Sequence, residues 1–209
     1  MNAPIIQGSP EWFAQRIGRA TGSRIKDIIA KTKSGYSASR ANYAAQLVAE
    51  RLTGKVEESF SNAAMKWGTD CEPLARAAYE VETGLMVDEV GMLDHPRIAM
   101  TGASPDGLVG VDGMLEVKCP NTATHIANLL SGEADSQYIP QMKWQMVCAN
   151  RNWCDFVSFD PRMPADMQLF IKRVNRDDKL IAEYEAEVVK FLAEVEETVA
   201  KLITLRRGN

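Results

Sequence analysis

The sequence predicts a protein of the α/β or α+β class, with a central mixed β-sheet flanked by helices. Three observations predict it. Helical patterns with start and stop residues fill the chain as far as Gly84. Residues 85–118 then lose the helical period and place several glycines between short apolar runs. Beyond residue 120, helical and strand-like patterns alternate, and this order is typical of helices packed around one sheet.

The first part of the chain has clear helix start and stop signals. Ser9 followed by Pro10 is typical of an N-cap and a first helical position. Gly54 and Gly84 each follow an amphipathic stretch and are expected to end a helix. The expected elements are a helix from Ser9, a helix after Thr21, a loop at 31–37, and helices at 39–53 and about 65–82.

The glycine-rich segment 85–118 is expected to form a meander of short strands with tight turns. Its apolar runs are residues 85–90, 98–101, 108–111 and 114–117. Further elements are expected as helices at about 121–130 and 138–150 and strands at 153–159 and 167–174. The chain then has a long amphipathic helix at about 177–205, with acids in its first turn and arginines in its last, as the helix macrodipole prefers.

The length of the chain predicts one domain, and its charged residues are distributed unevenly along the sequence. The 209 residues suit a single domain over 1–209, and 45% of them are hydrophobic, enough for a buried core. Residues 1–55 form a basic helical N-terminal part with nine Lys or Arg against three acids. That part is +6, so the other 154 residues sum to −10 in a chain of net charge −4. The asymmetry favours a local anionic partner; the alternative is a solvated basic surface.

Composition excludes several classes of protein. The four cysteines form no CxxC pair and there are only two histidines, which argues against a structural zinc site and for reduced cysteines. The N-terminus lacks the basic start and apolar run of a signal peptide. No stretch approaches the length of a membrane span. We therefore expect a soluble cytoplasmic protein.

One segment carries residues suited to chemistry, namely Ser104-Pro105-Asp106-Gly107 followed by Glu116-Val117-Lys118. A hairpin that reverses near Val111-Asp112-Gly113, with an Asp-Gly turn, would bring Asp106, at the start of one strand, beside the returning strand. Glu116 and Lys118 would then share one face of that strand, because side chains alternate. Two carboxylates and an ammonium group would meet at one edge of the sheet.

This set of groups suits phosphodiester hydrolysis. Asp106 and Glu116 offer the hard oxygen ligands that Mg²⁺ prefers. Bound Mg²⁺ lowers the pKa of a water and neutralises charge on a phosphate, and Lys118 could orient the attacking water. The alternative is an ordinary surface hairpin, because Ser-Pro-Asp-Gly is also a favoured β-turn sequence.

Seven short motifs extend this pattern over roughly residues 8–200. They are Gly8–Trp12, Arg16–Ser23, Gly68–Glu72, Ser104–Leu108, Leu115–Pro120, Tyr138–Gln141 and Asp160–Met163. Each motif is weak alone, but in this order and spacing the chain resembles the phage lambda exonuclease group. That group is also called the YqaJ-like viral recombinase family, within the PD-(D/E)xK nuclease superfamily. The resemblance implies a restriction-endonuclease-like core.

The resemblance also implies a role for each matching residue of the hairpin. Asp106 and Glu116 match the metal-binding acids, and the main-chain carbonyl of Val117 matches a further ligand. Lys118 matches the catalytic lysine. Glu72, on the helix before the sheet, matches another acid that contacts the metal directly or through water. Without the resemblance, Glu72 would be interpreted as an exposed helical residue.

Three further residues match positions outside the hairpin. Gln141 matches a glutamine that helps to position the attacking water, and otherwise would be an ordinary residue of a helix start. Arg16 and Ser23 match residues that hold the 5′-terminal phosphate of DNA, and otherwise would be a solvated arginine and a helical serine. A guanidinium and a hydroxyl near a helix N-terminus make a sensible phosphate site, and Arg16 lies in the basic segment.

The resemblance implies a Mg²⁺-dependent exonuclease, with Mn²⁺ as a substitute, that enters double-stranded DNA at a 5′-phosphorylated end. It would degrade one strand 5′ to 3′, release mononucleotides and leave a 3′ single-stranded tail for a single-strand annealing protein. Family members form homotrimeric rings around DNA, and such a chain is expected in a bacterial cytoplasm, encoded by a phage or prophage.

Two other functions stay open from the sequence. A structure-specific or restriction-like endonuclease of the same superfamily would share Asp106, Glu116 and Lys118 but would also cut closed circles. A catalytically silent module that binds DNA ends or proteins would show no Mg²⁺-dependent activity. The intact set of two acids and one lysine argues against the silent module.

Overall fold

The structure, a computed structural model, describes residues 5–56 and 63–207, so both ends of the expected 1–209 domain lie outside it. Its α-helices are α1 (Pro10–Arg16), α2 (Ile25–Ile29), α3 (Ala38–Thr53), α4 (Ala63–Thr83), α5 (Thr122–Ser131), α6 (Ile139–Ala149) and α7 (Asp178–Arg207). Short 3₁₀ helices are η1 (Gly22–Arg24), η2 (Ser136–Tyr138) and η3 (Ala165–Met167). Its strands are β1 (Ala20–Thr21), β2 (Lys31–Thr32), β3 (Gly35–Tyr36), β4 (Val87–Asp88), β5 (Leu93–Asp94), β6 (Thr101–Ala103), β7 (Gly107–Val109), β8 (Gly113–Lys118), β9 (Trp153–Phe159) and β10 (Leu169–Asn175).

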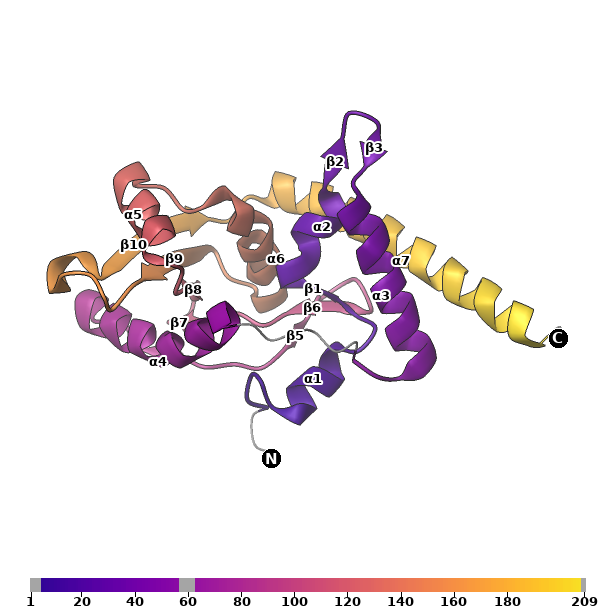
Figure 1. The fold of residues 1–209 in the computed structure, drawn as a ribbon, viewed down its shortest axis with the longest axis horizontal. Coiled ribbons are helices and arrows are strands. Elements are labelled where there is room, and N and C mark those ends of the chain that lie inside the picture. Colours follow the sequence, from indigo (N-terminus) through magenta and orange to yellow (C-terminus); the bar gives the residue numbers. More distant parts are fainter. Residues whose placement is uncertain (1–4, 57–62, 208–209) are drawn as a thin grey trace.

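A mixed five-stranded sheet lies at the centre of the fold, in the order β10-β9-β8-β7-β4 (Figure 1). Strands β8 and β9 are parallel, whereas the other neighbouring pairs are antiparallel. A three-stranded sheet has the order β1-β6-β5, and β2 pairs with β3 as a separate hairpin. The predicted class, a central mixed sheet flanked by helices, is confirmed.

Alternation along β8 decides which side chains meet which helical layer. Leu115 packs with residues of α4 on one face of the sheet. Met114 packs with methionines of α6 on the opposite face, and α5 covers that same side (Figure 1). Because side chains alternate, Glu116 and Lys118 belong to the α6 face, whereas Val117 belongs to the α4 core.

A further apolar cluster lies between α2, α3, α6 and α7. Within it, the rings of Tyr43 and Phe191 stack with centroids 5.5 Å apart, and both side chains are buried. Helix α7 runs along this layer, and its last turns extend past the other elements (Figure 1). Among the described residues, no helix combines the length and hydropathy needed to cross a membrane.

Most of the expected helices are confirmed, together with their caps. The Ser9 hydroxyl accepts a hydrogen bond from the amide of Trp12 at 3.2 Å, as an N-cap should. Gly54 and Gly84 take φ values of 66° and 69°, the left-handed conformation that favours glycine after a helix. The helix expected from about residue 65 begins at Ala63.

Two expectations about strands are wrong. The segment 31–37, expected to be a loop, contains the β2–β3 hairpin. The expected meander over 85–118 is divided between two sheets: β6 pairs with β5 and β1, while β7 and β8 join the central sheet. The turn expected near Val111-Asp112-Gly113 is confirmed to within one residue, because Val109 pairs with Gly113 and residues 110–112 connect β7 to β8. Strands of two residues carry no alternating pattern that a sequence could reveal.

Phe156, at the centre of β9, should be among the most stabilising residues of the central sheet. Its side chain is fully buried, packs with Met114 of β8 and stacks on the ring of Tyr138. We expect Phe156→Ala to lower the free energy of unfolding by about 3–5 kcal/mol in urea titrations. The control Val111→Ala, at an 82% exposed position, should change it by less than about 0.5 kcal/mol. Equal effects of the two variants would contradict this packing.

Candidate active site

Asp106 is held against β8 by main-chain contacts. It lies in the connection between β6 and β7, immediately before β7. Its amide donates to the carbonyl of Leu115 at 3.2 Å, and its Oδ2 accepts from the amide of Val117 at 2.7 Å. These contacts fix the carboxylate beside the end of β8, where the sequence places the other chemical groups.

Glu116 carries a fully buried carboxylate with several donors around it. Its Oε1 accepts from Nε2 of Gln141 at 2.6 Å, and its Oε2 accepts from Nε2 of Gln145 at 2.6 Å. Lys118 Nζ makes an ion pair with Oε1 of the same carboxylate. A buried charge needs such compensation, so the α6 face of β8 has a preorganised cluster of polar groups.

Lys118 lies at the solvent side of this cluster. Its side chain is 25% exposed, and Nζ is 4.9 Å from the ring centroid of Tyr138. Burial lowers the pKa of Lys118, but attraction to Glu116 and Asp106 outweighs it and raises the pKa above the ordinary lysine value. The ammonium group therefore stays charged at neutral pH and can donate to an anion.

The acidic side chains of the site lie close enough to affect one another's pKa. Burial raises the pKa of Asp106 well above its ordinary value, and Glu116 raises it further while Lys118 opposes the effect. Burial also raises the pKa of Glu72, against the effects of Arg76 and Lys118. A cation bound between these carboxylates would relieve this cost.

A cavity of about 440 Å³ opens onto these groups. Its lining includes Glu72 of α4 together with Asp106, Val117, Lys118 and Tyr138. Glu72 faces the cavity but is engaged elsewhere, because its Oε1 accepts from Arg76 at 2.5 Å. Glu72 thus lies near the other acids without touching them.

The donor set fits a hard divalent cation. Within residues 5–56 and 63–207, no group of three or more His, Cys, Asp or Glu side chains is arranged to hold a metal alone. The available donors are the carboxylates of Asp106 and Glu116 and the carbonyl of Val117, all oxygen. Mg²⁺ is commonly bound by one or two carboxylates while it keeps several waters, so this sparse set suits Mg²⁺ better than zinc.

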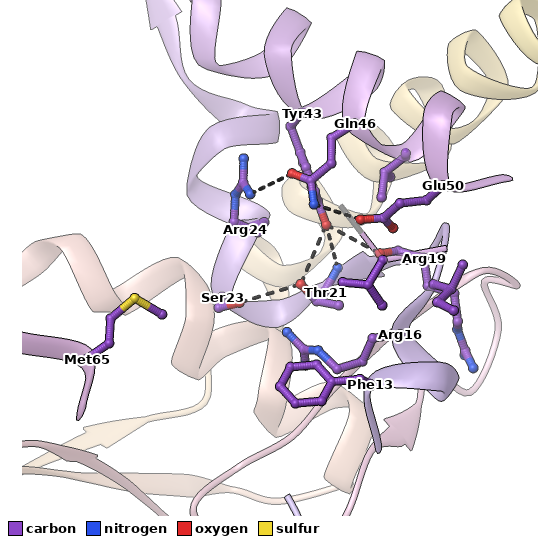
Figure 2. Close-up of a pocket in the computed structure, with 13 residues that line it drawn as sticks. Phe13, Arg16, Arg19, Thr21, Ser23, Arg24, Tyr43, Gln46, Glu50 and Met65 are labelled. Carbon is purple, nitrogen blue, oxygen red and sulfur yellow. Dashed lines mark hydrogen bonds between the residues drawn. The ribbon is translucent and has the colours of Figure 1, made fainter. Parts of the chain in front are cut away.

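A second cavity, of about 290 Å³, contains the other two predicted residues, Arg16 and Ser23. Figure 2 shows Arg16 and Phe13 of α1 facing Tyr43 of α3, with Thr21 between them and Ser23 beside Thr21. The guanidinium carbon of Arg16 lies 4.1 Å from the ring centroid of Trp12. Burial lowers the pKa of Arg16, but an arginine remains protonated at neutral pH. A stacked cation beside an exposed hydroxyl is a suitable anion site.

A third, small cavity of about 140 Å³ has walls from both regions. Its lining contains Arg16 and Ser23 from the second cavity and Asp106, Gln141 and Gln145 from the acidic site. Arg16 and Ser23 also line the 290 Å³ cavity, and Asp106 also lines the 440 Å³ cavity. The anion site and the acidic site are therefore neighbours, although about 90 residues separate Arg16 from Asp106 in the sequence.

Some residues of the site were missed by the sequence analysis. Gln145 binds Glu116, and Ser104 lines the small cavity while its Oγ accepts from Nε1 of Trp12 at 2.9 Å. Tyr138 covers Lys118. Gln145 follows Gln141 by four residues, one helical turn, and that spacing was the available signal.

Comparisons with known proteins show the family and the fold of the chain. Residues 11–152 match the model of the YqaJ-like viral recombinase domain. The chain is 52% identical to an alkaline exonuclease, LHK-Exo of Laribacter hongkongensis, over 96% of this chain and 99% of that one, with a TM-score of 0.90. A crystal structure of that enzyme with dAMP matches at 53% identity, with the same coverage and TM-score.

More distant relatives add information on the fold alone. A phage-related exonuclease from Haemophilus somnus 129PT has a TM-score of 0.71 at 15% identity, over 88% of this chain and 96% of that one. No curated protein matches the chain significantly.

Proposed function

The chain belongs to the family of YqaJ-like viral recombinase domains, and we propose that it is a Mg²⁺-dependent exonuclease acting 5′ to 3′ at ends of double-stranded DNA. Its identity of 52% with an alkaline exonuclease, over nearly the whole of both chains, makes it a deoxyribonuclease. The observation that carries the finer assignment is the cavity shared by Arg16, Ser23 and Asp106. Its walls come from both the anion site and the acidic site.

Hydrolysis would take place at the acidic site. Asp106, Glu116 and the Val117 carbonyl would hold Mg²⁺, which when bound activates a water and neutralises the scissile phosphate. Lys118 would donate to the attacking water or to a phosphoryl oxygen as negative charge develops. The Nε2 of Gln141 donates a hydrogen bond to Glu116. The Oε1 of Gln141 would therefore accept a hydrogen bond from the water. Glu72 would contact the metal through water.

The 5′-terminal phosphate would occupy the anion site. The Arg16 guanidinium and the Ser23 hydroxyl offer charge-assisted hydrogen bonds to a phosphate, and Ser104 lines the same small cavity. Because Asp106 also lines that cavity, the next phosphate along the strand would lie near the acidic site. Anchoring of the end thus favours removal of one nucleotide at a time from the 5′ side.

The products and partners follow from the proposed 5′ to 3′ direction of digestion. Digestion would release mononucleotides and leave a 3′ tail for a single-strand annealing protein; that the related enzyme binds dAMP supports mononucleotide release. A homotrimeric ring around DNA would keep an acidic chain on its substrate without tight, salt-sensitive phosphate binding. Light scattering that detected only monomers of the purified protein would contradict the ring. The expected location is the cytoplasm of a bacterial host of the phage or prophage.

A digestion assay distinguishes this function from its alternatives. Linear duplex DNA labelled at one 5′ end or at one 3′ end would be incubated with Mg²⁺, Mn²⁺ or EDTA, beside a covalently closed circle. We expect early release of the 5′ label with either metal, and no cutting of the circle. Cutting of the circle would favour the endonuclease of the same superfamily. No cutting of any substrate would favour the silent DNA-end-binding module.

Arg16 should determine the preference for phosphorylated ends. Loss of its contacts to a charged phosphate should reduce the rate on 5′-phosphorylated duplexes by about 10-fold to 100-fold. The rate of Arg16→Ala on dephosphorylated duplexes should stay near that of the wild type. The control Arg97→Ala, which removes an exposed arginine paired with Glu185, should keep the preference. An unchanged preference in Arg16→Ala would place the end phosphate elsewhere.

A further inference from the structure

Helix α6 offers two glutamines to one carboxylate. Gln141 and Gln145 are four residues apart, so they project from the same face of the helix. Each Nε2 lies 2.6 Å from a different oxygen of Glu116. Gln145 is only 1% exposed, and the same Nε2 also lies 3.3 Å from the carbonyl of Ser104. One amide therefore links α6, β8 and the segment that leads to Asp106.

The two oxygens of Glu116 differ in how many donors they already have. An ionised carboxylate has about two acceptor positions on each oxygen. Oε1 is approached by both Gln141 and Lys118, which uses both positions. Among the described residues, Oε2 accepts from Gln145 alone. Oε2 therefore keeps one acceptor position for another group.

We propose that Gln145 is a positioning residue that orients Glu116 so that Oε2 is the oxygen available to the divalent cation. This role rests on the proposed metal-dependent nuclease function. The terminal torsion of a glutamate is broad and has no strong rotamer preference, so hydrogen bonds must fix the plane of the carboxylate. Gln145 donates to Oε2 of Glu116, so it acts on the metal site through Glu116, as partners of metal ligands commonly do.

Replacement of Gln145 by methionine tests this role, because methionine has a similar length and no donor. The readout is the affinity of the full-length protein for Mn²⁺, measured by calorimetry without DNA. We expect Gln145→Met to bind Mn²⁺ about 10-fold or more weakly than wild type. The Mg²⁺ concentration for half-maximal hydrolysis should rise by a similar factor. Gln145→Asn, whose amide is one methylene too short, should shift both values in the same direction and covers the case in which the methionine variant does not fold.

A matched control separates positioning from a general effect on folding. Gln168 donates its Nε2 to the carbonyls of Pro161 and Met163 and does not touch Glu116. Gln168→Met should keep Mn²⁺ affinity within about twofold of wild type, even if its melting temperature falls. A merely structural role for Gln145 would give the same pattern in Gln145→Met, and that result would overturn the proposal. If wild type itself bound no Mn²⁺, the proposed function would fail first and this inference with it.

Discussion

Lys118→Ala is expected to lower the rate of DNA hydrolysis by roughly 10³-fold while the protein still binds DNA ends. The ammonium group makes an ion pair with the buried Glu116 carboxylate. Burial lowers the pKa of Lys118, but Glu116 and Asp106 raise it by more, so the net shift is upward. The ammonium group is therefore a fixed positive charge at the cavity wall, placed to act when charge develops on the phosphate. Single-turnover digestion with excess enzyme would measure the loss, and a binding titration in EDTA would measure retained affinity.

A second lysine–glutamate pair provides the control for Lys118→Ala. Lys172 contacts Glu133 at 3.0 Å on the exposed surface. Lys172→Ala removes the same charge and should leave the rate within about twofold of wild type, since exposed ion pairs contribute little. If Lys118→Ala were as active as Lys172→Ala, the assignment of Lys118 to the reaction would be wrong.

Asp106→Asn is expected to abolish metal-dependent hydrolysis, with a loss on the order of 10³-fold or more. Asparagine keeps the shape of the side chain, and its Oδ1 can still accept from the amide of Val117, as Oδ2 of Asp106 does at 2.7 Å. The substitution therefore removes one negative charge with little change to the hairpin. Because Asp106 and Glu116 are the paired carboxylates of the site, the variant should also lose affinity for Mn²⁺.

The melting temperature of Asp106→Asn helps to interpret that result. Burial and Glu116 raise the pKa of Asp106, so neutralising this side chain removes repulsion in the metal-free protein. We therefore expect the melting temperature without metal to be equal to or above that of wild type. The control Asp112→Asn changes an exposed turn residue beside Asn152 and should keep activity. An active Asp106→Asn variant would contradict the proposed metal site.

The hairpin of the site could be predicted from the sequence because its geometry is local. Alternation along a strand places Glu116 and Lys118 on one face, and a short return brings Asp106 beside them. The position of Arg16 and Ser23 beside Asp106 depended on the resemblance, because long-range contacts between α1, η1 and the sheet leave no local pattern. Gln145 had a local signal in its four-residue spacing from Gln141, but the spacing does not reveal that its amide is buried against Glu116.

The elements of the fold that have local sequence patterns could likewise be predicted, whereas those that depend on long-range pairing could not. Helices α3 and α7 were expected near their observed bounds because capping residues and apolar stripes repeat along them. The restriction-endonuclease-like core, expected from the resemblance, is confirmed by the match to LHK-Exo. Strands β1 and β5 were missed because each has two residues and forms only by pairing with β6. Their pairing brings Thr21 beside Gly102, close to the segment that carries Asp106.

We propose that Asp106, Glu116 and Val117 form the metal site of a nuclease. The most direct test is anomalous diffraction at the manganese absorption edge from crystals of the wild-type protein grown with Mn²⁺. We expect a strong anomalous peak in contact with the two carboxylates and the Val117 carbonyl, with Glu116 bound through Oε2. A peak bound only by other residues, or no peak in crystals whose protein is active with Mn²⁺, would contradict it.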